Sequence, residues 1–164
     1  MDIESLFDRQ FNRIYRTARM YLGNVQDAED AVQAVLLKCI EKQMEFEDVN
    51  HENAWFLTVT RNYCKDVLKT TWKKSVDLGE YPDDFEEEES DYGLMEHIMK
   101  LSEKYREVLY LYYYEELSIR EISKLLKRGE STIQTQLATA RKKLKIDLEK
   151  GDGYYGRKAD QRSI

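Results

Sequence analysis

The stretch SIREISKLLKRGESTIQTQLATARKKL, which runs from residue 118 to residue 144, decides the fold. Ser118 with Glu121 three residues later fits a capping box, which predicts that the short helix IREISKLL begins there. In the turn KRGE that follows, Gly129 can take a positive φ. Ser131 with a Gln three residues later repeats the capping-box pattern and predicts the start of a second helix. Two helices joined by a short turn that contains glycine form a helix-turn-helix.

The second of these helices has two distinct faces. Apolar residues recur at spacings of four, three and four, and this pattern predicts its inner face. These residues are Ile133, Leu137, Ala140 and Leu144. Short polar or small side chains near its start are candidates for contacts with base edges in DNA. They are Ser131, Thr132, Gln134, Thr135, Ala138 and Thr139.

Basic side chains follow along the same helix, where phosphates would flank a groove. They are Arg141, Lys142, Lys143 and Lys145. Because recognition helices read bases with their N-terminal part, this order favours DNA reading. The alternative is a basic helical hairpin that binds a partner protein.

The composition of the 164-residue chain favours an all-α fold. Hydrophobic residues make up 41% and charged residues 35%, which allows small cores surrounded by charge. One Pro and seven Gly leave few positions that would break a helix. The length suffices for one ordinary domain or for two small ones.

Negative charge is concentrated in one short stretch. Residues 76–94, VDLGEYPDDFEEEESDYGL, contain nine acids, no base and the only Pro. Such a segment repels itself and is poor in aliphatic residues, so we expect a flexible acidic linker. The rest of the chain is net positive although the whole has a formal net charge of −6, so the acidity does not argue against a nucleic-acid partner. We therefore expect two small helical domains, residues 1–75 and 95–150, and a disordered tail over residues 151–164.

The first domain shows helical periodicity in three segments. Apolar residues from Ile3 to Leu22 predict one helix, and Asn24 can cap a second that runs to about Lys42. A polar loop is expected over residues 43–53, with a third helix after it. The inner face of the second helix is expected to comprise Ala28, Ala31, Val32, Val35, Leu36, Cys39 and Ile40.

Two stripes in this domain are candidates for binding surfaces. Asp30, Gln33 and Leu37 lie on one outward stripe of the second helix, which suits a protein contact and a solvated face equally well. Asp27 lies one turn earlier, where an acid favours the helix dipole. On the third helix a basic stripe could track a phosphate backbone, or be an ordinary solvated face. Its members are Arg61, Asn62, Lys65 and Lys69.

Other classes of protein find little support in the sequence. Cys39 and Cys64 fall in helical patterns and are expected to be small buried residues, and no Cys or His pair has metal-ligand spacing. There is no nucleophile–base pair or phosphate loop, so we expect neither an enzyme nor a bound cofactor. No apolar run reaches about 18 residues, so we expect a soluble, cytoplasmic protein that does not insert into a membrane.

Three segments in this order resemble the extracytoplasmic-function group of bacterial sigma-70 family factors. They are DAEDAVQAVLLK from residue 27, AWFLTVTRNYCKDVLK from residue 54, and the stretch over residues 118–144. The resemblance covers about Ile3–Lys74 and Leu94–Leu148. It implies a promoter-specificity subunit of RNA polymerase, with the first domain as sigma region 2 and the second as region 4.

The resemblance also implies roles for the candidate residues. Asp27, Asp30 and Gln33, with Leu37 beside them, would grip the clamp coiled coil of the polymerase β′ subunit. The loop over residues 43–54 and the basic stripe of the third helix would melt the −10 element and hold a flipped base. The helix-turn-helix would read the −35 element in the major groove and touch the flap of the β subunit, and an anti-sigma factor is an expected partner.

The resemblance leaves open which −35 sequence is read and what the acidic linker does. Gln134 and Thr139 stand where the family commonly has Lys or Arg, which implies a different −35 sequence with fewer charge-assisted contacts. The acidic linker would thread through the polymerase cleft, or be a passive spacer. Outside the family, the alternatives are a stand-alone helix-turn-helix regulator that dimerises through its first domain, and a helical adaptor that never touches DNA.

Overall fold

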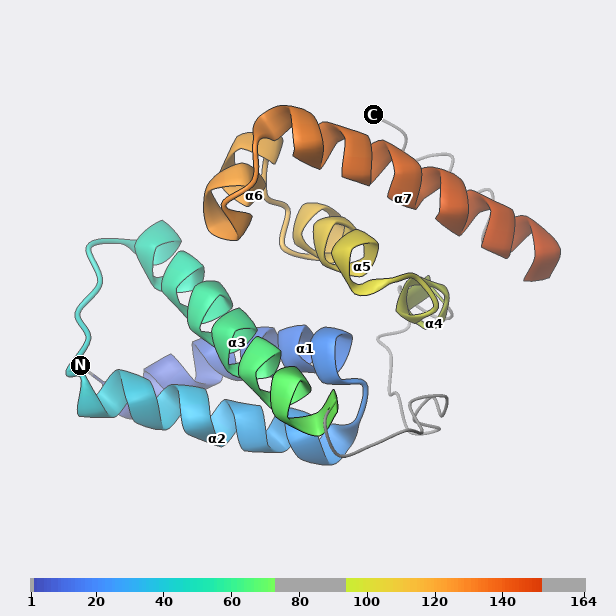
Figure 1. The fold of residues 1–164 in the computed structure, drawn as a ribbon. Helices are drawn as coiled ribbons and strands as arrows, with labels where there is room; N and C mark the ends of the chain where they lie inside the picture. Colours follow the sequence, from blue (N-terminus) through green and yellow to red (C-terminus); the bar gives the residue numbers. More distant parts are fainter. Residues whose placement is uncertain (1, 73–93, 152–164) are drawn as a thin grey trace. The chain divides into compact units, whose positions relative to one another are not determined.

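The computed structural model describes residues 2–72 and 94–151, with side chains up to residue 70 in the first stretch and residue 145 in the second. Every regular element in these two stretches is helical, which confirms the all-α prediction (Figure 1). Helices α1 to α3 form one compact unit and α4 to α7 form another. We call these the N-terminal and C-terminal units. The acidic stretch, except Leu94, and the tail, except Gly151, lie outside the described residues.

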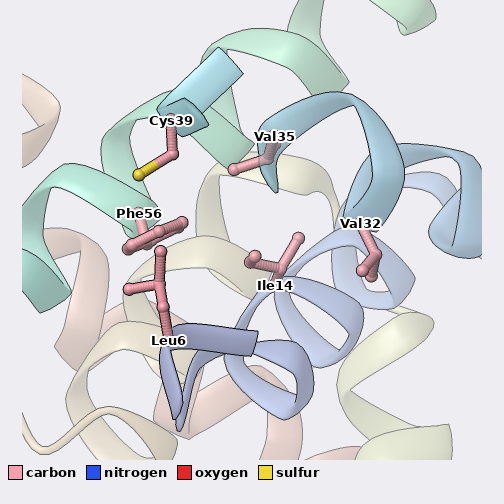
Figure 2. Packing of buried hydrophobic residues seen from close by; sticks show 6 residues of the cluster. All are labelled: Leu6, Ile14, Val32, Val35, Cys39 and Phe56. Carbon is pink, nitrogen blue, oxygen red and sulfur yellow. The ribbon is translucent and has the colours of Figure 1, made fainter. Parts of the chain in front are cut away.

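The N-terminal unit consists of α1 (Ile3–Leu22), α2 (Val25–Glu41) and α3 (Val49–Trp72), each of which packs against the other two. Side chains from all three helices meet in its core (Figure 2). The buried members are Leu6, Ile14, Val32, Val35, Cys39 and Phe56. Cys64 is buried as well, so both cysteines are buried residues, as predicted.

The ends of α1 and α2 follow from local side-chain chemistry. The Asp2 carboxylate accepts a hydrogen bond from the Glu4 N–H at the start of α1. Gly23 ends α1 with a φ of 82°, a conformation that suits glycine because it has no Cβ. The Asn24 side chain then accepts from the Asp27 N–H at 2.8 Å, so the predicted cap of α2 is confirmed.

Two predictions about the N-terminal unit are wrong. Helix α3 begins at Val49, so the connecting loop is shorter than the predicted residues 43–53. The reason is that the Asp48 carboxylate accepts from the His51 N–H at 2.8 Å and caps a polar first turn that resembles a loop in the sequence. Ile40 is 41% exposed and does not belong to the inner face of α2.

The C-terminal unit contains α4 (Leu94–Met99), α5 (Glu103–Leu109), the π-helical turn η2 (Tyr110–Tyr114), α6 (Ile119–Leu126) and α7 (Glu130–Gly151). Helices α4, α5 and α6 all pack against α7. The predicted inner face of α7 is buried, as are apolar residues of the other helices. The latter include Met95, Ile98, Val108, Leu109, Tyr110, Leu111, Ile122 and Leu126.

The turn between α6 and α7 is only partly as predicted. The capping box of Ser118 and Glu121 is present, and α6 has the predicted bounds. The left-handed residue, however, is Lys127 with a φ of 57°, not Gly129, because the chain must turn directly after the last residue of α6. Helix α7 begins at Glu130, so Ser131 lies in its first turn and is not the N-cap that the second capping box predicted.

Candidate nucleic-acid interface

The outer face of α7 presents the side chains that the sequence singled out as readers of DNA. Ser131, Thr132, Gln134, Thr135 and Ala138 are exposed, and Thr139 is half-buried. The Thr135 hydroxyl donates to the Ser131 carbonyl at 3.0 Å, which leaves its oxygen lone pairs as acceptors on the surface. These uncharged side chains can therefore make short-range hydrogen bonds and apolar contacts, next to the exposed carboxylate of Glu130 at the start of the helix.

The basic residues of α7 are not equivalent. Lys142, Lys143 and Lys145 are exposed, whereas Arg141 is half-buried. Lys143 places its ammonium 5.6 Å from the centre of the Tyr105 ring on α5, a cation–π contact that ties it to the unit. Lys142 is exposed, so its ammonium is hydrated and could bind a phosphate.

The members of the basic stripe of α3 also differ in how exposed they are. Asn62 and Lys69 are exposed, while Arg61 and Lys65 are half-buried. Spacings of four residues place Arg61, Lys65 and Lys69 on one side of the helix. The stripe can follow a chain of phosphates over about two helical turns.

The outward stripe of α2 is exposed, with one exception. Asp30 and Gln33 are exposed, and Leu37 is 54% exposed. Ile40 continues the same face, so the stripe ends in two aliphatic side chains. Asp27 is half-buried, and its carboxylate accepts from the Asn24 side-chain amide at 2.8 Å, so it helps to cap α2.

The acids of α2 also act on the neighbouring helix. Burial raises the pKa of the Tyr63 phenol on α3, and the nearby carboxylates of Asp30 and Asp27 raise it further. The phenol therefore stays neutral at physiological pH. Helices α2 and α3 pack against each other, which brings these carboxylates close enough to act on the phenol.

Sequence reasoning missed a polar cluster that joins α1 to the first turn of α3. The Glu52 carboxylate accepts from Arg9 at 2.9 and 3.2 Å and from Gln10 at 2.7 Å. Next to it, the Asn53 side-chain oxygen accepts from Gln10 at 2.9 Å and from Arg13 at 2.8 Å. Residues 52 and 53 fall in a stretch that the sequence predicts to be a loop, so no helical pattern points to this cluster. The cluster fixes the start of α3, which carries the basic stripe.

Sequence reasoning also missed Arg128 in the turn between α6 and α7. Its side chain donates to the Glu107 carboxylate on α5 and to the Gln136 side-chain oxygen on α7. No periodic pattern identifies a turn residue of this kind, because its partners lie at distant positions in the sequence.

Two family matches cover most of the chain. Residues 6–74 match the family described as sigma-70 region 2, and residues 93–144 match sigma-70, region 4. In the parts of the chain that the structure describes, no helix is long and apolar enough to cross a membrane.

Individual relatives agree with these matches. RNA polymerase sigma factor SigZ of Bacillus subtilis (strain 168) is 31% identical over 156 residues, which cover 91% of this chain and 88% of that protein. ECF RNA polymerase sigma factor SigW of the same organism is 27% identical over 157 residues, with 84% and 83% covered. The sigma factor RpoE of Bartonella quintana, solved in complex with the anti-sigma factor NepR, has a similar fold with a TM-score of 0.72. It is 21% identical, and the match covers 92% of this chain and 98% of that one.

Proposed function

Because the chain belongs to the extracytoplasmic-function group of the sigma-70 family, we propose that its two units divide the work of promoter-specific transcription initiation between them. The protein is an RNA polymerase sigma factor. In this proposal the N-terminal unit binds the core enzyme and opens the −10 element, and the C-terminal unit reads the −35 element. The stand-alone regulator that the sequence left open is not favoured by these matches.

The outer face of α7 is the observation that carries the proposal. Its N-terminal half presents amide, hydroxyl and methyl groups beside the exposed carboxylate of Glu130, and Lys142 follows further along the helix. The Gln134 amide can pair with an adenine, and the Thr135 hydroxyl oxygen can accept from a donor on a base edge. Ser131, Thr132, Ala138 and Thr139 would complete the reading face, and Arg141, Lys142 and Lys143 would bind phosphates.

The N-terminal unit would use two separate faces. The exposed stripe of Asp30, Gln33 and Leu37 suits a polymerase surface that offers both cations and an apolar contact, and Asp27 stands beside it, where its carboxylate also supports the Asn24 cap. The stripe of Arg61, Asn62, Lys65 and Lys69 on α3 would follow the separated strand of the −10 element. A flipped base would be taken up by the loop before α3.

The setting of the protein follows from this function. We infer that it acts in the cytoplasm with the polymerase, and that it contributes recognition and melting while the polymerase contributes catalysis. No cofactor is needed for these tasks. A relative is solved in complex with an anti-sigma factor, and we expect a partner of that class for this chain.

Run-off transcription tests the proposal most directly. Core polymerase is incubated with genomic fragments, with and without the full chain, and the transcripts are sequenced at their 5′ ends. We expect initiation at a small set of sites that share −35 and −10 sequences. Absence of any transcript that depends on the protein would contradict the proposal.

A further inference from the structure

Arg128 is bound to three helices at once. Its backbone N–H donates to the Ser123 carbonyl on α6 at 3.2 Å, and its own carbonyl accepts from the Ser123 hydroxyl. Its guanidinium donates to the Glu107 carboxylate on α5 and, at 3.0 Å, to the Gln136 oxygen on α7. One turn residue therefore connects α5 with α6 and α7, the two helices of the helix-turn-helix.

The partner on α5 makes this connection difficult to replace. Glu107 is 1% exposed, and a carboxylate buried to that degree needs a cation beside it. The planar guanidinium can bond two acceptors in fixed directions, whereas a lysine ammonium is a point charge on a flexible chain. Loss of Arg128 would leave the buried carboxylate without this cation and would release Gln136 from the turn.

Gln136 lies at the edge of the face of α7 that would read DNA. Helix α7 turns by about 100° per residue, so half-buried Gln136 shares its side of the helix with Thr132 four residues before it and Thr139 three residues after it. The buried face of α7 sets the rotation of the helix about its own axis, and the bond from Arg128 to Gln136 adds a polar restraint to that rotation. The direction in which the reading side chains point depends on that rotation.

We propose that Arg128 is a positioning residue for −35 recognition, holding α7 in register through Glu107 and Gln136. The proposal rests on the function proposed above, in which α7 reads the −35 element. It predicts a loss of discrimination between base pairs that is separate from any loss of folding. A misdirected α7 keeps its phosphate contacts and loses its base contacts.

The test uses the full chain assembled with core polymerase and a promoter found by run-off transcription. Initiation is measured on that promoter and on a copy with one substituted −35 base pair, and the ratio is compared between variants. Glu107→Gln combined with Arg128→Gln removes both charges and so avoids an unpaired buried carboxylate. We expect the ratio to fall by about tenfold, because a mismatched base pair typically costs that much or more, while initiation on the substituted promoter stays near the wild-type level.

Two further variants and the pattern of losses decide the proposal. Arg128→Lys keeps the charge without the two-acceptor geometry and should also lower the ratio; it decides the matter alone if the double variant does not fold. Lys124→Gln removes one exposed positive charge from α6 and should leave the ratio unchanged. An equal loss on both promoters, or an unchanged ratio, would overturn the positioning role. A wild-type protein that directs no initiation would instead overturn the proposed function.

Discussion

At the end of α6, Lys127 has a φ of 57°, in the left-handed region that side chains with a Cβ rarely adopt. Its N–H donates to the Ser123 carbonyl, so this conformation is what ends the helix. A lysine there costs about 1–2 kcal/mol relative to glycine, less the entropy that glycine loses on folding. The turn therefore carries strain at one exposed residue.

Lys127→Gly should relieve that strain. We expect the free energy of unfolding of the C-terminal unit to rise by about 0.5–1 kcal/mol. The measurement is hydrogen exchange of the α6 and α7 amides in the full chain over a urea series. Lys124→Gly, three residues earlier in regular helix, is the matched control and should cost about 1 kcal/mol. A loss of stability in both variants would show that Lys127 has a role beyond its conformation.

The Glu52 carboxylate gives a second prediction at this scale. Its hydrogen bond from Arg9 holds the pKa of Glu52 below the usual 4.5, against the opposing effect of burial. A carboxylate with a lowered folded-state pKa stabilises the fold above its unfolded pKa, and that stabilisation is lost as the pH falls through the folded value. Because Arg9 is half exposed, solvent screens the pair, and its contribution is modest.

Glu52→Gln should therefore destabilise the N-terminal unit by about 1 kcal/mol at pH 7. The gap to wild type should narrow as the pH is lowered from 5 towards 3, because protonation removes the same charge from the wild type. Urea unfolding followed by tryptophan fluorescence reports on this unit, since both tryptophans precede residue 73. Glu45→Gln in the neighbouring loop is the exposed control, and a gap that is independent of pH would contradict the argument.

The faces of the helices were predictable from the sequence, and some of their ends were not. The 3.6-residue period placed Ile133 and Leu137 inside and Gln134 outside, because burial along a helix follows from spacing alone. The start of α3 was missed because its first turn is polar and is held by the Asp48 cap and the Arg9–Glu52 contact. The Arg9–Glu52 contact joins residues about forty positions apart, so no local pattern in the sequence reveals it.

The sequence also did not show which contacts the individual outward side chains of these helices make. Asp27 is partly committed to its cap, and Lys143 lies near the Tyr105 ring, although both carry the charge that the candidate sites require. A periodic pattern tells which side of a helix faces outward. It does not tell whether a neighbouring helix already uses the charge.

On α7, different residues should read bases and bind phosphates. Gln134→Ala is expected to relax the preference at one −35 base pair, at a cost of about 1–3 kcal/mol on the preferred sequence only. Lys142→Gln should weaken binding to all sequences alike and reduce the salt dependence by about one phosphate contact. Both are measured in the holoenzyme on promoters with each −35 position substituted in turn. If Gln134→Ala acts equally on all sequences, Gln134 does not read a base.

At the scale of the whole molecule, two small units each have their own core and their own candidate surfaces. Linking two weak contacts in one chain raises the overall affinity, because the second contact forms at a high effective concentration. Uncharged readers on α7 can therefore suffice for a promoter if the N-terminal unit brings the polymerase and the −10 contact. This dependence predicts that a defect on α2 removes function while α7 remains intact.

Asp30→Ala combined with Gln33→Ala tests that dependence. Both side chains are exposed, so the N-terminal unit should stay folded, while binding to core polymerase should weaken by about 2 kcal/mol, or roughly thirtyfold. The measurement is a fluorescence titration of labelled full chain with core enzyme, alongside run-off transcription. Asp8→Ala combined with Asn12→Ala removes an exposed acid and an exposed amide from α1 and serves as the control. Promoter discrimination by the residual holoenzyme should be unchanged, because α7 is untouched. Equal polymerase affinity in the two double variants would mean that the α2 stripe is a solvated face and that the core enzyme is bound elsewhere.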